Sequence, residues 1–416
     1  MSKVNDIFVY AHWVGLEDSL LMGTLYPKEA RGNEVFEFQY DEKWLKNQSH
    51  RMLDPNLQPY AGSFFPKEGA LNFGMFLDSS PGNWGRQLMQ KKETAIARKE
   101  KRAVRVLSET DFLLGVFDFY RSGALRFKTR VDGEFVTSDE QFILPSLSSL
   151  RELEHASMRL NDDALDREFL PSLEILTAAG AVLGGKRPKA TVIDNDWQMW
   201  IAKFPQENDL VDIGGWEFVA HTMAGLAGIQ TSPSMIRRLN TSHHTFMAQR
   251  FDRTMKGERI HFATAATLLG HSTSLTTLTP TYLDLVGFLM QHGANVGSDL
   301  EELWRRIVFN IAIKNTDDHL NNHGFVLTRE GWKLSPVYDL NPEADGVGLS
   351  LNISEHDNSL DFELAMSVAE YFRVKPEKAK SILREITLVT GQWRKIAADA
   401  GLSKAEQERM SRAFVS

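Results

Sequence analysis

The chain has 416 residues, 42% of them hydrophobic and 25% charged, so its composition is that of an ordinary globular protein long enough for two or three folded units. It contains no cysteine, which excludes disulfides, thiolate metal sites and cysteine nucleophiles. Its formal net charge of −8 at pH 7 argues against a protein that wraps nucleic acid over much of its surface, because phosphate binding needs a concentrated positive field.

The N-terminal segment is predicted to be a first strand. It reads MSKVNDIFVYAHWVG and lacks an apolar stretch between basic residues and a small-residue cleavage site, so we expect no export signal. No apolar run reaches the roughly 18 residues that a membrane helix needs, so no membrane contact is expected. We therefore expect a cytoplasmic protein.

The first part of the chain is predicted to be rich in β-structure. Residues 7–38 alternate apolar residues with turn signals and predict a small sheet, and residues 64–89 end in the start of a helix. Residues 111–127 predict a helix, a glycine turn and a strand. Residues 91–105 carry seven basic and two acidic side chains, which is typical of a solvated helix face; contact with a partner protein or DNA is the alternative. We place a domain boundary near residue 140.

After a polar helix around residues 147–169, the pattern is a glycine-rich loop, a strand, a tight turn at 194–196 and a second strand at 197–204. The loop combines Gly184 and Gly185 with Lys186 and Lys189. Glycines allow a backbone to close around phosphates, and neighbouring cations favour this use. The loop is not a Walker A motif, which needs Gly-Lys-Ser/Thr at the start of a helix, and a Gly pair before a strand is also typical of an ordinary turn.

The second strand carries Lys203 among apolar residues, where an unpaired ammonium group would be costly to bury. A helix predicted over 215–226 supplies Glu217 as a partner, and a further strand is expected at 245–251. A strand lysine that is held by a helix glutamate and contacts the α- and β-phosphates is how kinases bind a nucleotide. The alternative is a lysine that snorkels from an edge strand.

From about residue 265 the chain is predicted to be helical, apart from the loop NTDDHLNNHGF at 315–325 and a hairpin that turns at 328–331. The loop contains Asp317 and Asn322, and VYDL ends with Asp339 followed by Leu340. In phosphoryl transfer one carboxylate orients the attacking hydroxyl, while an amide oxygen and a second carboxylate hold Mg²⁺. A polar loop shaped only by turn geometry is the alternative. His319 has no companion at metal-ligand spacing, so we interpret it as a residue that orients the loop. No G-x-S-x-G motif is present, which disfavours a Ser/His/Asp hydrolase.

These motifs, taken together, resemble those of the HipA family of bacterial serine/threonine kinases, the toxins of type II toxin–antitoxin modules. The similar stretches, in chain order, are LDSSPGNWGRQLM at 77–89, LLGVFDFYRSGALRF at 113–127, LGGKRPKATV at 183–192, WIAKFP at 200–205, AQRFDR at 248–253, NTDDHLNNHGF at 315–325 and VYDLNP at 337–342. The resemblance implies an α+β, two-lobed protein-kinase-like fold, distantly similar to phosphatidylinositol kinases. Its expected parts are a β-rich subdomain at 1–140, a kinase N-lobe at 141–255 and an all-helical C-lobe at 256–416.

The resemblance also implies roles for single residues, with ATP and Mg²⁺ as cofactors. Asp317 becomes the catalytic base, assisted by His319, and Lys203 becomes the phosphate-binding lysine with Glu217 as its partner. Asn322 and Asp339 become the Mg²⁺ ligands, with Asn322 also beside the nucleotide. The remaining expected contacts with ATP come from the glycine loop, the hinge strand 247–251 beside adenine and a residue near the ribose: Gly184, Gly185, Lys186, Lys189, Gln249, Phe251 and Asp252.

The function implied is phosphorylation of a serine or threonine on a cellular protein, for which an aminoacyl-tRNA synthetase is one candidate, with growth arrest as the result. The partners implied are a small HipB-like helix-turn-helix antitoxin and, mainly through it, operator DNA. A weakly active or inactive kinase-like protein that serves as antitoxin partner and co-repressor is the alternative, and a small-molecule or lipid kinase shares the same core. Two departures bear on activity: residues 181–183 lack the serine that many relatives autophosphorylate, and Asn321 replaces a common Lys or Arg.

Overall fold

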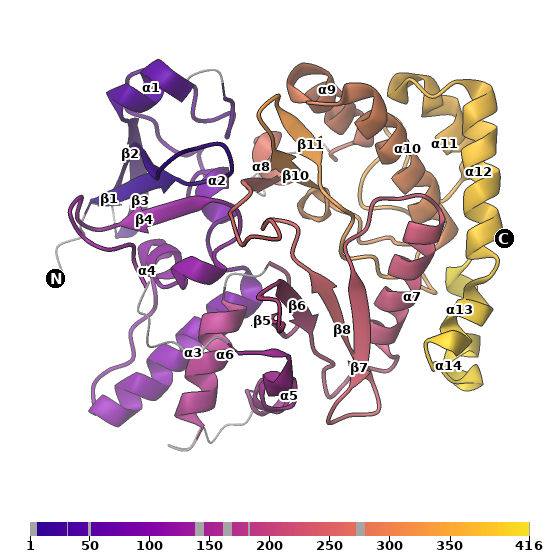
Figure 1. Ribbon diagram of the computed structural model, residues 1–416, viewed down its shortest axis with the longest axis horizontal. Helices are drawn as coiled ribbons and strands as arrows, with labels where there is room; N and C mark the ends of the chain where they lie inside the picture. Colours follow the sequence, from indigo (N-terminus) through magenta and orange to yellow (C-terminus); the bar gives the residue numbers. More distant parts are fainter. Residues whose placement is uncertain are drawn as a thin grey trace. The chain divides into compact units, whose positions relative to one another are not determined.

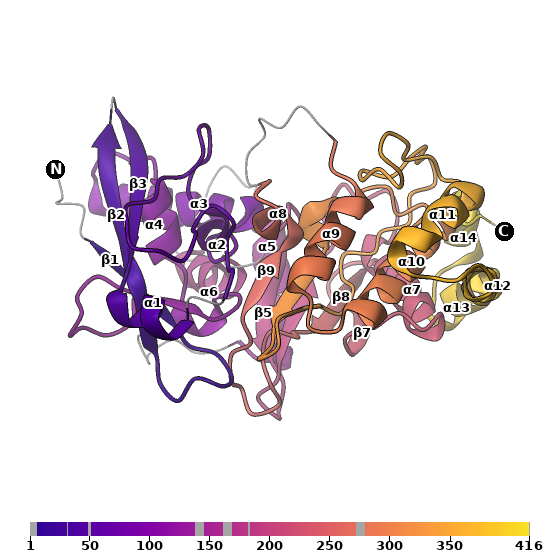
Figure 2. The same cartoon turned by 90° about the horizontal axis from the view of Figure 1, so that it is seen from above.

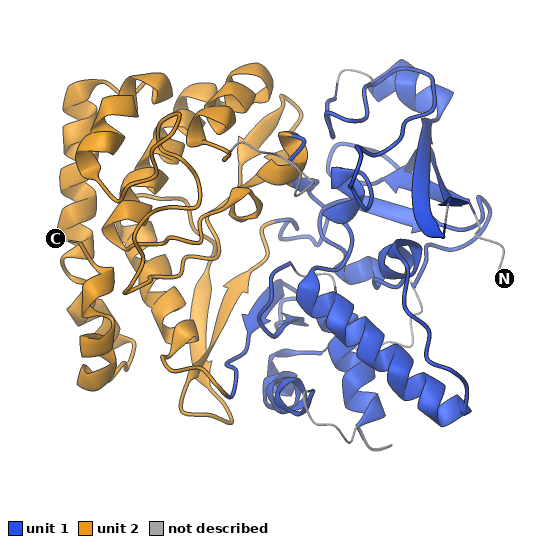
Figure 3. Cartoon of the chain, turned by 180° about the vertical axis from the view of Figure 1, so that it is seen from behind, with its two compact units in different colours: residues 1–207, 252–263, 270–275 blue, residues 208–251, 264–269, 276–416 orange. Residues whose placement is uncertain are grey.

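The computed structural model describes residues 6–30, 32–48, 51–137, 145–160, 169–181, 184–271 and 279–415. The chain divides into two compact units (Figure 3). Unit 1 comprises residues 1–207, 252–263 and 270–275, and unit 2 comprises residues 208–251, 264–269 and 276–416. The boundary predicted near residue 140 lies outside the described residues.

A four-stranded antiparallel sheet, in the order β3-β2-β1-β4, forms the first half of unit 1 (Figure 1). Its strands are β1 (Ile7–Ala11), β2 (Leu20–Ala30), β3 (Asn33–Tyr40) and β4 (Leu125–Lys128). Alternate residues of each strand face the same side, which places apolar side chains in one core. The buried members of this core include Ile7, Val9, Leu25, Phe36, Phe38, Phe76 and Phe127. The predicted sheet over residues 7–38 is confirmed.

The rest of unit 1 includes several α-helices (Figure 1). They are α1 (Glu42–Gln48), α2 (Gly74–Leu77), α3 (Asn83–Glu100), α4 (Glu109–Leu114), α5 (Leu150–Arg159) and α6 (Leu170–Gly180). Helix α3 packs on α6, and α6 packs on strand β5. The basic segment 91–105 is helical only as far as Glu100, because Lys101 adopts a left-handed conformation with φ 56° and ends the helix. The prediction of one continuous helix face over 91–105 was wrong beyond that point.

A hairpin of β5 (Lys189–Ile193) and β6 (Met199–Lys203) follows in unit 1. Its register pairs Lys189 with Lys203 and Ile193 with Met199. The predicted tight turn is confirmed, since one carboxylate oxygen of Asp194 accepts hydrogen bonds from the backbone N–H groups of Asp196 and Gln198, both at 2.9 Å. The two predicted strands are therefore present and adjacent.

Unit 2 contains more helix than strand among its described residues, with two hairpins (Figure 1). The first hairpin follows α7 (Ile213–Leu226) and joins β7 (Ser234–Arg238) to β8 (His244–Gln249); the second joins β10 (Gly324–Leu327) to β11 (Trp332–Leu334). Between them, β9 (Phe262–Thr264) leads the chain out of unit 1 into α8 (Ala265–Leu268). The other helices are α9 (Tyr282–His292), α10 (Val296–Ala312), α11 (Phe362–Val368), α12 (Pro376–Thr390), α13 (Trp393–Asp399) and α14 (Lys404–Arg409).

Helix α10 is the centre of unit 2, with α11 and α12 packed beside it (Figures 1 and 2). It is buried over most of its length, and even Arg306 is enclosed, where it donates to Glu302 and to the carbonyl of Ser335. A second cluster forms where the Trp216 ring meets Trp393 and Phe414. None of the described helices is long and apolar enough to cross a membrane. The predicted α+β fold class is confirmed. The expectation that residues 256–416 are all helical was wrong, because strands β9, β10 and β11 lie in this range.

Candidate active site

The loop that follows α10 presents the carboxylate of Asp317 to solvent. The Asp317 side chain is 81% exposed, and the nearest His319 nitrogen lies 4.0 Å from its Oδ1. The loop backbone is fixed around it, because the carbonyl of Asp317 accepts hydrogen bonds from the amide of Asn322 at 2.9 Å and from the backbone N–H of His319 at 3.0 Å. A reactive group is thus exposed on a segment whose backbone is held in place.

The neighbouring Asp318 points the opposite way, into the protein, and anchors the loop. Its Oδ2 accepts hydrogen bonds from Tyr282, from Asn310 at 2.8 Å and from Nε2 of His323 at 2.9 Å. Since an ionised carboxylate only accepts, His323 carries its hydrogen on Nε2. Burial alone would raise the pKa of Asp318, but attraction to His323 and the hydrogen bonds from His323 and Tyr282 outweigh it and lower the pKa.

Asp339 lies on a second loop of unit 2 that is tied to the first. The hydroxyl of Tyr338 donates to the carbonyl of Asn321 at 2.7 Å, and the backbone N–H of Asn341 donates to the side-chain oxygen of Asn315 at 3.1 Å. Asp339 itself is left-handed, with φ 61°, and is partly buried. Asn341 donates to its Oδ1 at 3.3 Å. These bonds keep the two predicted Mg²⁺-binding segments together.

The amide of Asn322 shows how these segments could hold a metal ion. Its nitrogen is used by the carbonyl of Asp317, so its oxygen is the atom left to accept a cation. Amide and carboxylate oxygens suit Mg²⁺, which also keeps water and phosphate oxygens in its shell. Asn322 and Asp339 therefore fit this cation. Among the described residues there is no cluster of three or more His, Asp or Glu side chains, as an all-protein metal cage would need.

Three other predicted residues belong to unit 2. Gln249 ends strand β8, and Phe251 follows it with its ring centroid 5.9 Å from that of Tyr338. The predicted adenine-side segment is thus adjacent to the loop of Asp339. Glu217 lies on α7 and is 3% exposed. Its predicted partner Lys203 belongs to unit 1, and the pairing stays a prediction.

The predicted phosphate-binding residues belong to unit 1. Gly184, Gly185 and Lys186 are exposed, and Gly185 has φ 85°, a conformation that other residues rarely adopt. Lys189 differs from the other loop cation because its ammonium group folds back and donates to the carbonyl of Gly184. Lys203 is partly buried at the end of β6, opposite Lys189. Two like charges thus face each other across the hairpin, next to an exposed glycine loop.

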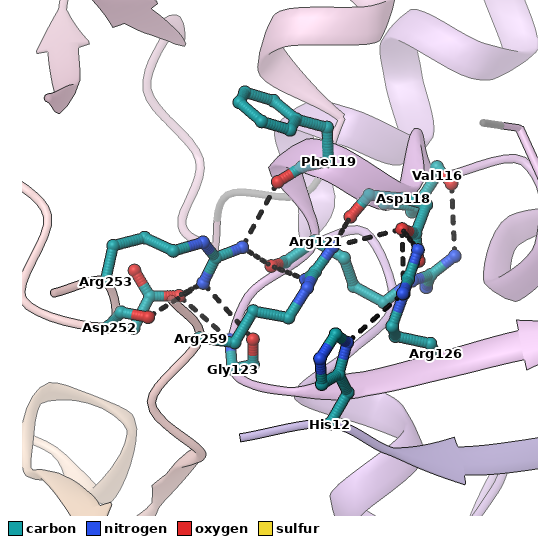
Figure 4. Close-up of polar contacts among 10 residues, drawn as sticks. All are labelled: His12, Val116, Asp118, Phe119, Arg121, Gly123, Arg126, Asp252, Arg253 and Arg259. Carbon is teal, nitrogen blue, oxygen red and sulfur yellow. Dashed lines mark hydrogen bonds and ion pairs between the residues drawn. The ribbon is translucent and has the colours of Figure 1, made fainter. Parts of the chain in front are cut away.

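Asp252 is engaged with the protein itself (Figure 4). It is 5% exposed, and its Oδ2 accepts hydrogen bonds from the backbone N–H of Gly123 and from Arg253, both at 2.9 Å. Arg253 also donates to the carbonyls of Gly123 and Arg121. These contacts fasten segment 252–263 to the N-terminal part of unit 1. A role for Asp252 at a ribose stays a prediction.

Next to this cluster, unit 1 has a cavity of about 500 Å³. Asp118 lines this cavity and accepts hydrogen bonds from Arg126 at 2.7 Å and from Arg259 at 3.1 Å (Figure 4). Burial would raise the pKa of Asp118, but Arg259 and Arg126 outweigh it and lower the pKa. The guanidinium groups are thus directed to acceptors of the protein, and none of the predicted site residues lines the cavity. The cavity is separate from the candidate active site.

Each unit therefore assembles one part of the predicted set. Unit 2 brings together Asp317, His319, Asn322, Asp339 and Phe251, while unit 1 holds the glycine loop with Lys189 and Lys203. Sequence reasoning gave no role to Asp318, Asn315 or Tyr338. A signal for Asp318 was the Asp-Asp pair itself, since the chemistry needs only one exposed carboxylate at that point.

Comparison with known proteins places this geometry in a family. Among solved structures, the chain resembles that of the Shewanella oneidensis MR-1 toxin–antitoxin system HipA, HipB and its operator DNA, with a TM-score of 0.65, 15% identity, and coverage of 98% of this chain and 94% of that chain. This likeness confirms the predicted HipA-like fold class. A Helicobacter pylori proinflammatory kinase, CtkA, has a TM-score of 0.34, 10% identity, and coverage of 51% of this chain and 94% of that chain, which is too weak to support an inference.

No curated protein matches this chain in sequence. The HipA-like C-terminal domain family matches residues 181–393, which is more than half of the 416 residues and includes the glycine loop, Lys203 and the loops of Asp317 and Asp339. The chain is therefore a member of the HipA family.

Proposed function

We propose that the chain is an ATP- and Mg²⁺-dependent serine/threonine protein kinase that acts as the toxin of a type II toxin–antitoxin module. The observation that carries this proposal is the arrangement of loop 317–322, where a solvent-exposed carboxylate stands on a backbone that Asn322 and the buried Asp318 hold rigid. A group that orients an incoming hydroxyl must be reachable and yet fixed within about 3 Å of the proton it accepts.

In the proposed mechanism Asp317 accepts the proton of a serine or threonine hydroxyl on a cellular protein. Asn322 and Asp339 would hold Mg²⁺, which would neutralise the charge of the phosphates. Lys203 and the backbone of Gly184 and Gly185 bind the phosphates of ATP. His319 and Tyr338 keep the two loops of unit 2 in position. Glu217 orients Lys203, and Gln249 and Phe251 border the adenine.

The partners follow from the same family membership. The similar Shewanella structure holds HipB and operator DNA. We propose that this chain likewise binds a small helix-turn-helix antitoxin, and operator DNA mainly through that antitoxin. An aminoacyl-tRNA synthetase is a candidate substrate, and the proposed location is the cytoplasm.

Asp317→Asn tests the proposal because it keeps the shape of the side chain and removes the base. Transfer of labelled phosphate to protein should fall by roughly 10²–10⁴-fold, while Mg²⁺-dependent ATP binding measured by titration stays near the parent value. Glu330→Gln is the matched control, since Glu330 is an exposed acid in the turn between β10 and β11.

Two results would count against the kinase. Transfer at the parent rate by Asp317→Asn would remove the assigned base. Absence of metal-dependent ATP binding by the parent would instead favour a kinase-like antitoxin partner without activity. Growth arrest on induction, lost in Asp317→Asn and kept in Glu330→Gln, would connect the transfer to toxicity.

A further inference from the structure

The first turn of helix α3 lies directly against the glycine loop, within unit 1. Gly82 is the N-cap of α3, and Trp84 in the first turn is 4% exposed. The backbone N–H of Trp84 donates to the carbonyl of Gly185 at 3.2 Å, and its indole N–H donates to the carbonyl of Lys189 at 2.9 Å. A single tryptophan therefore contacts the exposed loop at Gly185 and the buried first residue of β5, Lys189.

Backbone on both sides of this contact approaches too closely for any side chain. A Cβ on Gly82 would lie 2.7 Å from the Cα of Gly184, and one on Gly85 would lie 2.0 Å from the carbonyl oxygen of Ala181. A Cβ on Gly180 would lie 2.6 Å from the carbonyl oxygen of Lys189. In each case the obstacle is main chain, which cannot move away as a flexible side chain does. These glycines are needed for close packing and not for a turn.

The start of α3 is itself firmly held. Arg86 forms a bidentate ion pair with Glu109, which includes a 2.7 Å hydrogen bond, and its Nε donates to the carbonyl of Pro81 at 3.1 Å. Bidentate pairs of this kind restrict geometry more than a single contact does. The first turn of α3 is thus a rigid surface on which a loop can be fixed.

We propose that this first turn, with Trp84 at its centre, is a positioning device for the phosphate-binding loop. The proposal rests on the proposed function, because it takes residues 184–189 to be the segment that binds the phosphates of ATP. The same indole bond also holds strand β5 at Lys189, which pairs with Lys203 on β6, the strand that carries the phosphate-binding lysine. Trp84 is a positioning residue and has no contact with nucleotide in this scheme.

Trp84→Phe in the full chain is the first test, since it keeps an aromatic ring and removes the indole donor. Amide hydrogen exchange of peptides that cover 184–189, measured without nucleotide, should become faster. The KM for ATP and the Kd for ATP should rise by roughly fivefold to tenfold, the equivalent of one lost hydrogen bond, while kcat at saturating ATP changes less.

Trp200→Phe is the matched control. Trp200 lies on β6 and is nearly buried, and its indole donates to Asp194 at 2.8 Å near the turn end of the same hairpin. It should leave the exchange of 184–189 and the affinity for ATP unchanged. Gly82→Ala is a second variant that addresses the close contact without touching the indole, and it should reproduce the faster exchange and the higher KM.

The outcomes separate this proposal from the proposed function. Unchanged exchange at 184–189 in both Trp84→Phe and Gly82→Ala overturns the positioning role, whatever happens to ATP. Faster exchange in a chain that binds ATP with unaltered affinity and KM also overturns it. Faster exchange in variants of a parent that never binds ATP overturns the proposed function, and with it the use of this contact for phosphates, while the packing of the loop on α3 stands.

Discussion

The two loops that carry the proposed chemistry are held by opposite means. Loop 317–322 in unit 2 is anchored by side chains, because the carboxylate of Asp318 is buried among three hydrogen-bond donors. Loop 184–189 in unit 1 is held through its backbone, because Trp84 donates to two of its carbonyls and glycines without a Cβ let the neighbouring main chain approach. The first loop therefore depends on a buried charge, and the second depends on hydrogen bonds from Trp84 and on close packing of main chain. The two loops should respond differently to substitution and to pH.

The largest effect is expected from Asp318→Ala. It leaves the hydroxyl of Tyr282 and the donors of Asn310 and His323 buried without their acceptor, which should cost about 3–5 kcal/mol of local stability. Hydrogen exchange in peptides that cover 315–325 measures this loss. Asp318→Asn keeps an oxygen at the same place and should cost clearly less; equal losses for the two variants would show that the charge network is not the anchor.

Gly85→Ala should have the next largest effect. The added methyl group meets the carbonyl oxygen of Ala181, and the strain of a forced shift should lower the free energy of unfolding by about 1–3 kcal/mol. Gly287→Ala is the control, since no atom lies within 4 Å of its added Cβ on helix α9 and alanine favours helices by about 0.8–1.0 kcal/mol. Chemical denaturation compares the two variants with the parent. If Gly85→Ala left the free energy of unfolding unchanged, this would contradict the close packing of α3 on Ala181.

Acid should affect the anchor of loop 317–322 and leave that of loop 184–189 unchanged. The folded pKa of Asp318 is lowered, so its stabilising contribution is complete above the ordinary carboxyl pKa and is lost as pH falls through the folded pKa. The difference in free energy of unfolding between the parent and Asp318→Asn should be present at about pH 5 and should narrow below about pH 4. The difference in free energy of unfolding between the parent and Gly85→Ala should stay constant over the same pH range, because no titrating group lies at that contact.

The smallest effect is expected from Tyr338→Phe. This change removes the hydrogen bond to the carbonyl of Asn321 at the surface and keeps the ring that contacts Phe251, so the loss should be about 0.5–1.5 kcal/mol. Exchange of amides in 317–322 and 337–341 is the measurement. A loss as large as that of Asp318→Ala would mean that the link between the two loops, and not the buried carboxylate, holds the site together.

Turns and helix starts could be predicted from the sequence, because the residues that determine them are close together in the chain. The turn at 328–331 is confirmed by the hydrogen bond from Thr328 to Gly331 at 2.8 Å, and the helix predicted from Gly215 begins at Ile213, where Asp212 caps it. The residue types in loop 315–325 indicated chemistry before any fold was known. The end of α3 at Glu100 was missed because Lys101 is left-handed without being glycine.

The contacts that anchor the two loops could not be predicted from the sequence, and the reason is physical. Tyr282 is 36 residues from Asp318, and Trp84 is 105 residues from Lys189. Neither pairing produces a periodic signal or a short motif, since each depends on where whole elements pack. A glycine needed for close packing also looks the same in a sequence as one needed for a turn. For this reason the sequence indicates no separate role for Gly82 and Gly85.

The left-handed backbone of Asp339 affects how its role can be tested cleanly. Asparagine and glycine adopt this conformation more readily than other residues do. Asp339→Asn and Asp339→Gly therefore remove the carboxylate without straining the backbone. Asp339→Ala adds a conformational cost of about 1 kcal/mol or more to the loss of the carboxylate. An inactive alanine variant would have two possible causes, whereas the asparagine variant removes the negative charge of Asp339 without backbone strain.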